Sequence, residues 1–222
     1  MKVVLFGATR GMGRALARLM AERGDRLFLL GHVPDALERS AADLELRGTK
    51  GTVGTAVCDL LDSATFDGAL DRAETALGGF DTVVVTAGLF GTQEELEADA
   101  ELAARVVLAD YAHTVIFCEN ARKRLPAEGG GTLCVFSSVA GERGRKPVIL
   151  YGSAKAGLSR YLEGLDHKFR SAGLRTVCVK PGFVKTGMTA GLKPPPFSAE
   201  ADDVARRVLK AIDRGRDRKS VV

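Results

Sequence analysis

The feature that most constrains the fold of this chain is a regular alternation of short apolar runs with longer stretches of helical spacing. The apolar runs are rich in Val and Leu and have the length of buried strands. The candidate strands are KVVLF, RLFLLG, VGTAVCDL, DTVVVTAG, GTLCVFSS and LRTVCVKPG, and the candidate helices are 12–23, 34–47, 63–77, 102–125, 151–171 and 199–212.

Strands that are apolar along their whole length must be covered on both faces. Alternation with helices provides this cover through right-handed crossovers and makes the strands parallel. We therefore expect an α/β protein with a three-layer, doubly wound parallel sheet, a Rossmann fold, in the strand order 3-2-1-4-5-6 with at most a short seventh strand. The 222 residues contain no long Pro-rich linker, so 1–222 is predicted to be a single domain.

Composition excludes several classes of protein. Lys and Arg number 32 against 28 Asp and Glu, and their spread along the chain argues against a dedicated nucleic-acid-binding protein. The first apolar run is too short for a signal peptide or a membrane span, so we expect a cytoplasmic protein. Four cysteines occur singly in apolar stretches, without metal-site spacing, and are interpreted as buried, reduced thiols: Cys58, Cys118, Cys134 and Cys178.

Seven basic residues gather late in the sequence and allow two interpretations. A helix and its exit could present them to phosphates or to an anionic membrane surface. A solvated helix face is the interpretation that we favour. The seven are Arg206, Arg207, Lys210, Arg214, Arg216, Arg218 and Lys219.

A glycine-rich turn follows the first apolar run and leads directly into a helical pattern. At such a junction, backbone N–H groups and the positive helix end face a pyrophosphate, and glycine permits its close approach. The turn predicts a nucleotide site, and a tight turn without a ligand is the alternative. Its residues are Gly7-Ala8-Thr9-Arg10-Gly11-Met12-Gly13.

The GxxxGxG spacing of this turn, together with motifs farther along, resembles the short-chain dehydrogenase/reductase family over nearly the whole chain. The resemblance implies an NAD(P)-dependent oxidoreductase acting on a small carbonyl or alcohol substrate. It places Gly7, Thr9, Arg10, Gly11, Met12 and Gly13 at the cofactor. The other matching motifs are Asp59-Leu60, Thr86-Ala87-Gly88, Tyr151 with Lys155, and Pro181-Gly182-Phe183-Val184-Lys185-Thr186. From these motifs the resemblance places further residues at the cofactor, namely Asp59, Leu60, Ala87, Gly88, Tyr151, Lys155, Pro181, Gly182, Val184 and Thr186.

The second candidate strand indicates which cofactor is preferred. A carboxylate at the end of this strand usually binds the ribose 2′-hydroxyl of NAD, whereas the 2′-phosphate of NADP needs a cation. Here the strand ends Gly31-His32, and Arg10 precedes Gly11. We expect NADP(H) to be preferred over NAD(H), with Arg10 and His32 near the phosphate.

A tyrosine and a lysine lie four residues apart at the start of a helical pattern. Tyr151 and Lys155 would therefore share one helix face, where an ammonium group favours the phenolate and lowers the tyrosine pKa. Tyr151 could then donate a proton to a carbonyl oxygen. By resemblance, Ser138 binds the substrate oxygen, and its spacing from Tyr151 favours it over the neighbouring Ser137.

Two departures from the family pattern concern polar groups. Thr86-Ala87-Gly88 replaces the frequent Asn-Asn-Ala-Gly, and cofactor binding should survive this change. Asp110 stands where the family has an asparagine that supports a proton-relay water. An ionised carboxylate accepts hydrogen bonds but donates none, so Asp110 is expected to hold a water or to strengthen the charge of Lys155. His113 is interpreted as a packed histidine.

The segment 187–199 carries Met188, Leu192 and Phe197 and is expected to cover the substrate. Short motifs, including Ala140-Gly141-Glu142-Arg143, resemble the family branch of decaprenylphosphoryl keto-ribose reductases, so reduction of a polyprenyl-phosphate-linked keto-sugar is one alternative. A non-catalytic NADP(H)-binding sensor is another. The resemblance also implies a homodimer or homotetramer formed through 102–125 and 151–171.

Overall fold

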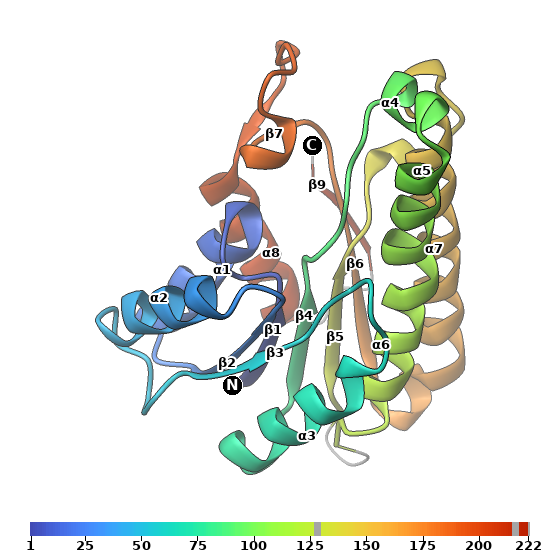
Figure 1. Cartoon of the computed structure of the whole chain (residues 1–222). Helices are drawn as coiled ribbons and strands as arrows, with labels where there is room; N and C mark the ends of the chain where they lie inside the picture. The colour runs from blue at the N-terminus through green and yellow to red at the C-terminus, as the bar shows by residue number, and fades with distance from the viewer. Residues whose placement is uncertain (127–129, 215–217, 222) are drawn as a thin grey trace.

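A seven-stranded parallel sheet forms the middle of three layers in the computed structural model, which describes residues 1–126, 130–214 and 218–221 (Figure 1). The strand order β3-β2-β1-β4-β5-β6-β9 confirms the predicted order, and the short seventh strand is β9. The strands are β1 (Lys2–Phe6), β2 (Arg26–Gly31), β3 (Gly54–Val57), β4 (Thr82–Val85), β5 (Thr132–Phe136), β6 (Arg175–Pro181) and β9 (Arg218–Val221).

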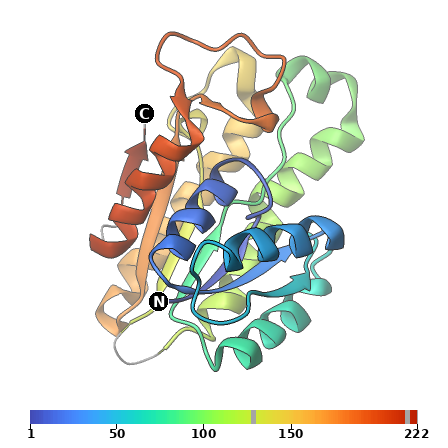
Figure 2. The ribbon, with the colours of Figure 1, turned by 90° about the vertical axis from the view of Figure 1, so that its left-hand side faces the viewer.

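Helices cover both faces of the sheet (Figures 1 and 2). Successive residues of a strand point to opposite faces, so β1 sends Val3 and Leu5 into one core and Val4 and Phe6 into the other. The first core lies under α1 (Gly11–Glu22), α2 (Pro34–Glu45) and α8 (Ala201–Arg214), and the second under α3 (Thr65–Leu77), α6 (Thr114–Arg122) and α7 (Ile149–Phe169).

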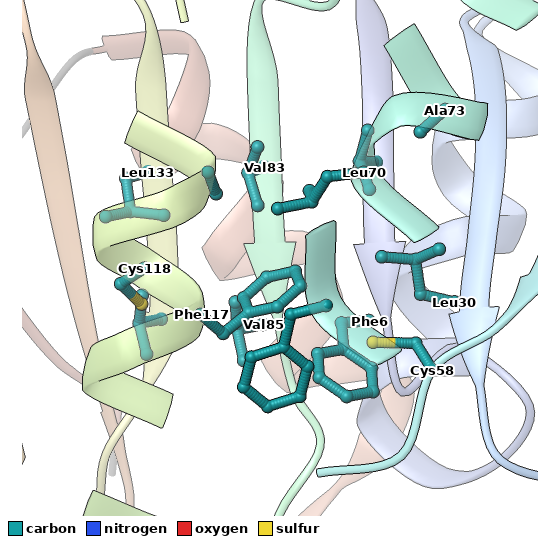
Figure 3. Close-up of a cluster of buried hydrophobic side chains, with 14 of the residues drawn as sticks. Phe6, Leu30, Cys58, Leu70, Ala73, Val83, Val85, Phe117, Cys118 and Leu133 are labelled. Carbon is teal, nitrogen blue, oxygen red and sulfur yellow. The ribbon is translucent and has the colours of Figure 1, made fainter. Parts of the chain in front are cut away.

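An aromatic cluster joins the end of β1 to the helices of the second core (Figure 3). The ring centroid of Phe6 lies 4.8 Å from that of Phe117, and Phe66 meets Phe117 edge-on at 5.5 Å. Such tilted and edge-on contacts stabilise the packing beyond the burial of apolar area. They hold α6 against the strand that leads into the glycine turn.

The structure does not contain the single long helix that we predicted over 102–125. The chain forms α5 (Ala100–Val107), then a π-helical segment over Leu108–His113, and then α6. A π-helical turn takes one extra residue, which an apolar pattern with helical period does not reveal. The short helix α4 (Gln93–Ala98) was also not predicted, although its capping box of Thr92 and Glu95 is a recognisable helix start.

Several short elements complete the described part of the chain. Strands β7 (Val184–Lys185) and β8 (Ala199–Glu200) pair in parallel and bracket the segment 187–199. The 3₁₀ turns are η2 (Val139–Gly141), η3 (Lys146–Val148), η4 (Arg170–Ala172) and η5 (Gly187–Thr189).

The cysteines and the basic residues can be compared with their predictions. All four cysteines are buried and free, as expected. Of the late basic residues, Arg216 lies outside the described ranges, and Arg206 forms an ion pair with Asp203 on the exposed surface of α8. No helix in the described ranges is both long and apolar enough to cross a membrane.

Candidate active site and nucleotide cleft

The glycine turn is held against the end of β4 by the hydroxyl of Thr86. This hydroxyl donates hydrogen bonds to the carbonyl oxygens of Phe6 and Gly7, at 3.2 and 3.0 Å. A Cβ on Gly13 would lie 2.3 Å from the same hydroxyl oxygen, so only glycine fits there. Gly7 and Gly11 have positive φ angles of 99° and 56°, which favour glycine. Thr86, at the position where the sequence departs from the family motif, thus holds the glycine turn against β4.

A cavity of about 270 Å³ opens above this turn, at the carboxyl ends of the strands, where doubly wound sheets bind ligands. Most of the predicted cofactor residues line it, namely Gly7, Thr9, Arg10, Gly11, Met12, Gly13, His32, Asp59, Leu60, Ala87, Gly88 and Thr186. The cavity is therefore framed by the glycine turn and by the ends of β2, β3 and β4.

Sequence reasoning missed part of this lining. Leu89 and Arg105 also face the cavity, and Arg105 comes from α5, for which no motif pointed to the nucleotide. Of the other predicted cofactor residues, Tyr151, Pro181, Gly182 and Val184 line a second cavity instead, and Lys155 lines neither. The sequence did not indicate that Leu89 and Arg105 line this cavity, because only the fold brings them close to the strand ends.

The end of β2 presents no carboxylate to the cavity. Its lining residues there are Gly31, His32 and Val33. The acidic residue among the described lining residues is Asp59, which follows β3 and uses Oδ1 to accept the N–H of Leu61 at 2.9 Å. Asp59 is thus engaged in its own turn, while Arg10 supplies a cation to the cavity.

Tyr151 lies in the first turn of α7, and that turn is anchored from outside the helix. The side-chain oxygen of Gln93 accepts the N–H groups of Ile149 and Leu150, at 2.8 and 3.2 Å. The ring of Tyr151 meets Phe90 edge-on at a centroid distance of 5.1 Å. These contacts fix the direction of the phenol, since they hold both the helix end and the ring.

Ser138 and Lys155 complete the cluster around this phenol. Ser138 lowers the pKa of Tyr151, and its hydroxyl accepts the N–H of Ala140 at 3.1 Å. The Lys155 ammonium lies 5.7 Å from the Tyr151 ring centroid. By contrast, the hydroxyl of Ser137 donates to the carbonyl of Lys155 and bonds to Ser159, so it anchors α7. The structure thus brings together the serine, tyrosine and lysine that the spacing predicted.

Asp110 lies at the centre of this arrangement. It is fully buried in the π-helical segment, and its Oδ1 lies 3.3 Å from Lys155 Nζ and accepts the N–H of Leu89 at 3.0 Å. Its other oxygen, Oδ2, has no hydrogen-bond partner in the described part of the chain. Lys155 also donates to the carbonyl of Phe136 at 3.3 Å. The predicted neighbourhood of Asp110 and Lys155 is therefore present as a buried ion pair.

The pKa values of this group are set by burial and by mutual charge. Burial raises the pKa of Asp110 above its ordinary value, although the Lys155 ammonium opposes the shift. Burial alone would lower the pKa of Lys155, but the charges of Asp110, Tyr151 and Cys178 and the hydrogen bond with Asp110 together outweigh it, and the pKa is raised. The pKa of Tyr151 is also raised, because burial exceeds the lowering by Lys155 and the charge of Asp110 adds to it. The expectation of a lowered tyrosine pKa was therefore wrong, because it omitted burial.

A second cavity, of about 440 Å³, adjoins Tyr151 and Ser138. Its walls are mainly apolar and include Phe90, Val148, Phe183 and Leu192. Met12, Thr186 and Met188 line both cavities, so the two spaces meet at these residues. A ligand in the second cavity can therefore face a nucleotide in the first.

His113 packs rather than facing either cavity. Its Nδ1 lies 2.8 Å from the carbonyl oxygen of Leu60, and its ring meets Phe66 edge-on at 5.9 Å. His113 therefore lies packed in the protein, as its sequence position led us to expect.

Comparison with known proteins gives a consistent result. The family model for short chain dehydrogenases matches residues 1–196. An uncharacterized oxidoreductase of Mycobacterium tuberculosis is 35% identical over 214 residues, covering 96% of this chain and 85% of its own. The cis-4-hydroxycyclohexanecarboxylate dehydrogenase of Sinomonas cyclohexanicum is 30% identical over 213 residues, covering 95% and 83%. A variant of actinorhodin polyketide ketoreductase solved with NADPH has a similar fold, with a TM-score of 0.88 at 20% identity over 99% of this chain and 94% of that one.

Gly88 provides a stability test of the buried pair. A Cβ at Gly88 would lie 2.6 Å from Asp110 Oδ1, so Gly88→Ala must displace the carboxylate. We expect a loss of about 1–3 kcal/mol in the free energy of unfolding, the usual cost of overpacking. Denaturant unfolding measures it.

Gly164→Ala is the matched control for this substitution. Gly164 lies inside α7, and an added Cβ would meet nothing within 4 Å. This change should stabilise the protein by up to about 1 kcal/mol, because alanine favours helix. Equal effects of the two substitutions would contradict the close contact of Gly88 with Asp110.

Proposed function

The chain belongs to the short-chain dehydrogenase/reductase family and is an NAD(P)-dependent oxidoreductase, and we propose that it reduces a ketone with NADPH, using Tyr151 as the proton donor. The observation that carries the proposal is the Ser138–Tyr151–Lys155 cluster, whose serine and tyrosine line the second cavity where it adjoins the nucleotide cavity. Such a placement serves a reaction in which a carbonyl carbon receives hydride while its oxygen receives a proton.

The residues of the cleft fit a dinucleotide. Glycines at the turn leave its backbone open to a phosphate, and the start of α1 directs N–H groups towards it. The bound nicotinamide would supply the hydride. Arg10 and His32, without a competing carboxylate at the end of β2, favour the 2′-phosphate of NADPH over the free hydroxyl of NADH.

Ser138, Tyr151 and Lys155 have different roles at the substrate oxygen. Ser138 donates a hydrogen bond that orients the oxygen, and Tyr151 delivers its proton to the alkoxide as it forms. The Lys155 ammonium stabilises the phenolate that remains. Phe90 and Gln93 position the phenol, because one packs on the ring and the other caps the helix that carries it.

Asp110 acts as a positioning residue in this proposal. Its carboxylate holds the Lys155 ammonium and the backbone of Leu89 together, and its charge opposes ionisation of Tyr151. The unpaired Oδ2 is a site for the relay water that the family supports with asparagine.

The remaining parts of the chain fit a substrate cover and a homo-oligomer. Met188 and Leu192 of the segment 187–199 line the substrate cavity, and we assign this segment as its cover within a single domain.

Exposed apolar residues follow one another along α5, the π-helical segment and α6, which is the surface expected of a homodimer or homotetramer. They are Val107, Leu108, Tyr111 and Ile116.

The first prediction from this proposal concerns Tyr151. Purified protein should oxidise NADPH in the presence of some members of a panel of ring ketones, keto-sugars and 3-oxoacyl thioesters. Tyr151→Phe should lower kcat by about a thousandfold, because general acid catalysis contributes roughly a hundredfold to ten-thousandfold. NADPH binding by the variant should persist, because the glycine turn, Arg10 and His32 are unaltered. Full turnover in the variant would remove Tyr151 from its role, and tight NADPH binding without any tyrosine-dependent turnover would support the sensor alternative.

Arg10 tests the cofactor preference. Arg10→Ala should weaken NADPH binding by about tenfold, the effect of losing a charge-assisted hydrogen bond, and leave NADH binding unchanged. Fluorescence titration of both cofactors measures this. Arg14→Ala is the control, since Arg14 is exposed on the next turn of α1 and does not line the cavity. Comparable dissociation constants for the two cofactors in the unaltered protein would contradict the preference.

Asp110→Asn tests the electrostatic role of the carboxylate. The charge of Asp110 raises the pKa of Tyr151, so its removal lowers that pKa. The pH profile of alcohol oxidation should therefore shift to lower pH. Asp166→Asn is the control, because Asp166 is also largely buried on α7 but pairs with Arg170. An unchanged profile in Asp110→Asn would reduce Asp110 to a structural residue.

A further inference from the structure

The substrate cavity carries few charged groups. Among the described residues that line it, only Glu94 and Arg145 have charged side chains, and the others are apolar or carry a hydroxyl. Both side chains are exposed to solvent at the cavity, where they can meet a charged group of a ligand. The chemistry of these two residues therefore bears on the substrate.

Most hydroxyls of the cavity are already engaged in local structure. Thr92 Oγ1 accepts the N–H of Glu95 at 3.3 Å, and the hydroxyl of Thr189 donates to the carbonyl of Val184 at 2.7 Å. Ser137 anchors α7. Ser138 and Tyr151 are assigned to the substrate carbonyl, and Glu94 and Arg145 are the charged groups that remain for the rest of a substrate.

Glu94 and Arg145 differ in what surrounds them. Glu94 lies in the first turn of α4, where N–H groups free of helical bonds already favour a carboxylate. Arg145 directly precedes η3, and its carbonyl accepts the N–H of Val148 at 3.1 Å, so its backbone is held at the cavity. Within residues 1–126, 130–214 and 218–221, no carboxylate forms an ion pair with Arg145. Arg145 is therefore the cation that still lacks an anionic partner.

We propose that the substrate is a largely apolar ketone that carries an anionic group, a carboxylate or a phosphate, which Arg145 binds. The inference rests on the proposed function, because it assigns the carbonyl to Ser138 and Tyr151. A guanidinium binds either anion through two parallel hydrogen bonds, and the apolar walls take the body of the molecule.

Binding to a variant whose turnover is strongly reduced tests this assignment. Tyr151→Phe saturated with NADPH is titrated calorimetrically with oxoalkanoates of increasing chain length, with their methyl esters, and with oxoalkyl phosphates. The acid of the best length should bind about tenfold more tightly than its ester, which is the order of magnitude of an ion pair at a solvent-exposed site. The phosphate series shows which anion is preferred.

Three further substitutions in the same background locate the effect. Arg145→Gln should abolish the preference for acid over ester and leave ester binding unchanged. Arg143→Gln and Lys146→Gln remove the same charge from the same segment but outside the cavity lining, so the preference should persist. If all three variants lost the preference for the acid, the summed positive charge of this segment would be its cause, and the role of Arg145 would be overturned.

The outcomes separate this inference from the proposed function. Equal affinities for acid and ester, or no binding by any probe, would contradict the anionic substrate. Turnover of neutral ketones by the unaltered protein would then still support the reductase. An acid preference that depends on Arg145, without tyrosine-dependent turnover of any bound acid, would instead retain the anion site and contradict the reductase.

Discussion

The close contact of Asp110 with Lys155 above Gly88 is the constraint on which the rest of the site depends. Two charges removed from water are stable only when each has well-placed partners, so the carboxylate needs both the ammonium and the N–H of Leu89. The lysine in turn reaches the carbonyl of Phe136. One pair thereby connects the ends of β4 and β5 to the π-helical segment and to α7.

This constraint explains features that otherwise look unrelated. Gly88 must lack a side chain, because Asp110 occupies the place of its Cβ. The π-helical segment is found at Asp110, where an ordinary α-helix gives way to a wider turn, and such turns are frequent at functional sites. The hydroxyls of Ser137 and Ser159 fix the carbonyl of Lys155 from the other side. The lysine is thus held at both its backbone and its charge.

The same burial that stabilises the geometry also sets its chemistry. A phenol in an apolar cavity ionises with difficulty, and the ammonium of Lys155 only partly offsets this. Tyr151 is therefore kept protonated, which suits a proton donor in the reductive direction. The apolar walls of the substrate cavity and the cation at Arg145 then act on different parts of a ligand, one on its body and the other on its charge.

The sequence by itself determined the strands, the glycine turn and the shared helix face of Tyr151 and Lys155, because these depend on local periodicity and on short spacings along one element. The strand order followed from the expected doubly wound fold, and Ser138 from the resemblance to a family. It also indicated that Asp110 would lie near Lys155, through the position that it takes in a family pattern. It did not reveal that Thr86 would hold the glycine turn, that Arg105 would line the nucleotide cavity, or that burial would raise the pKa of Tyr151. Those properties arise from residues far apart in the chain, and only the tertiary structure decides which side chains meet and how much water remains between them.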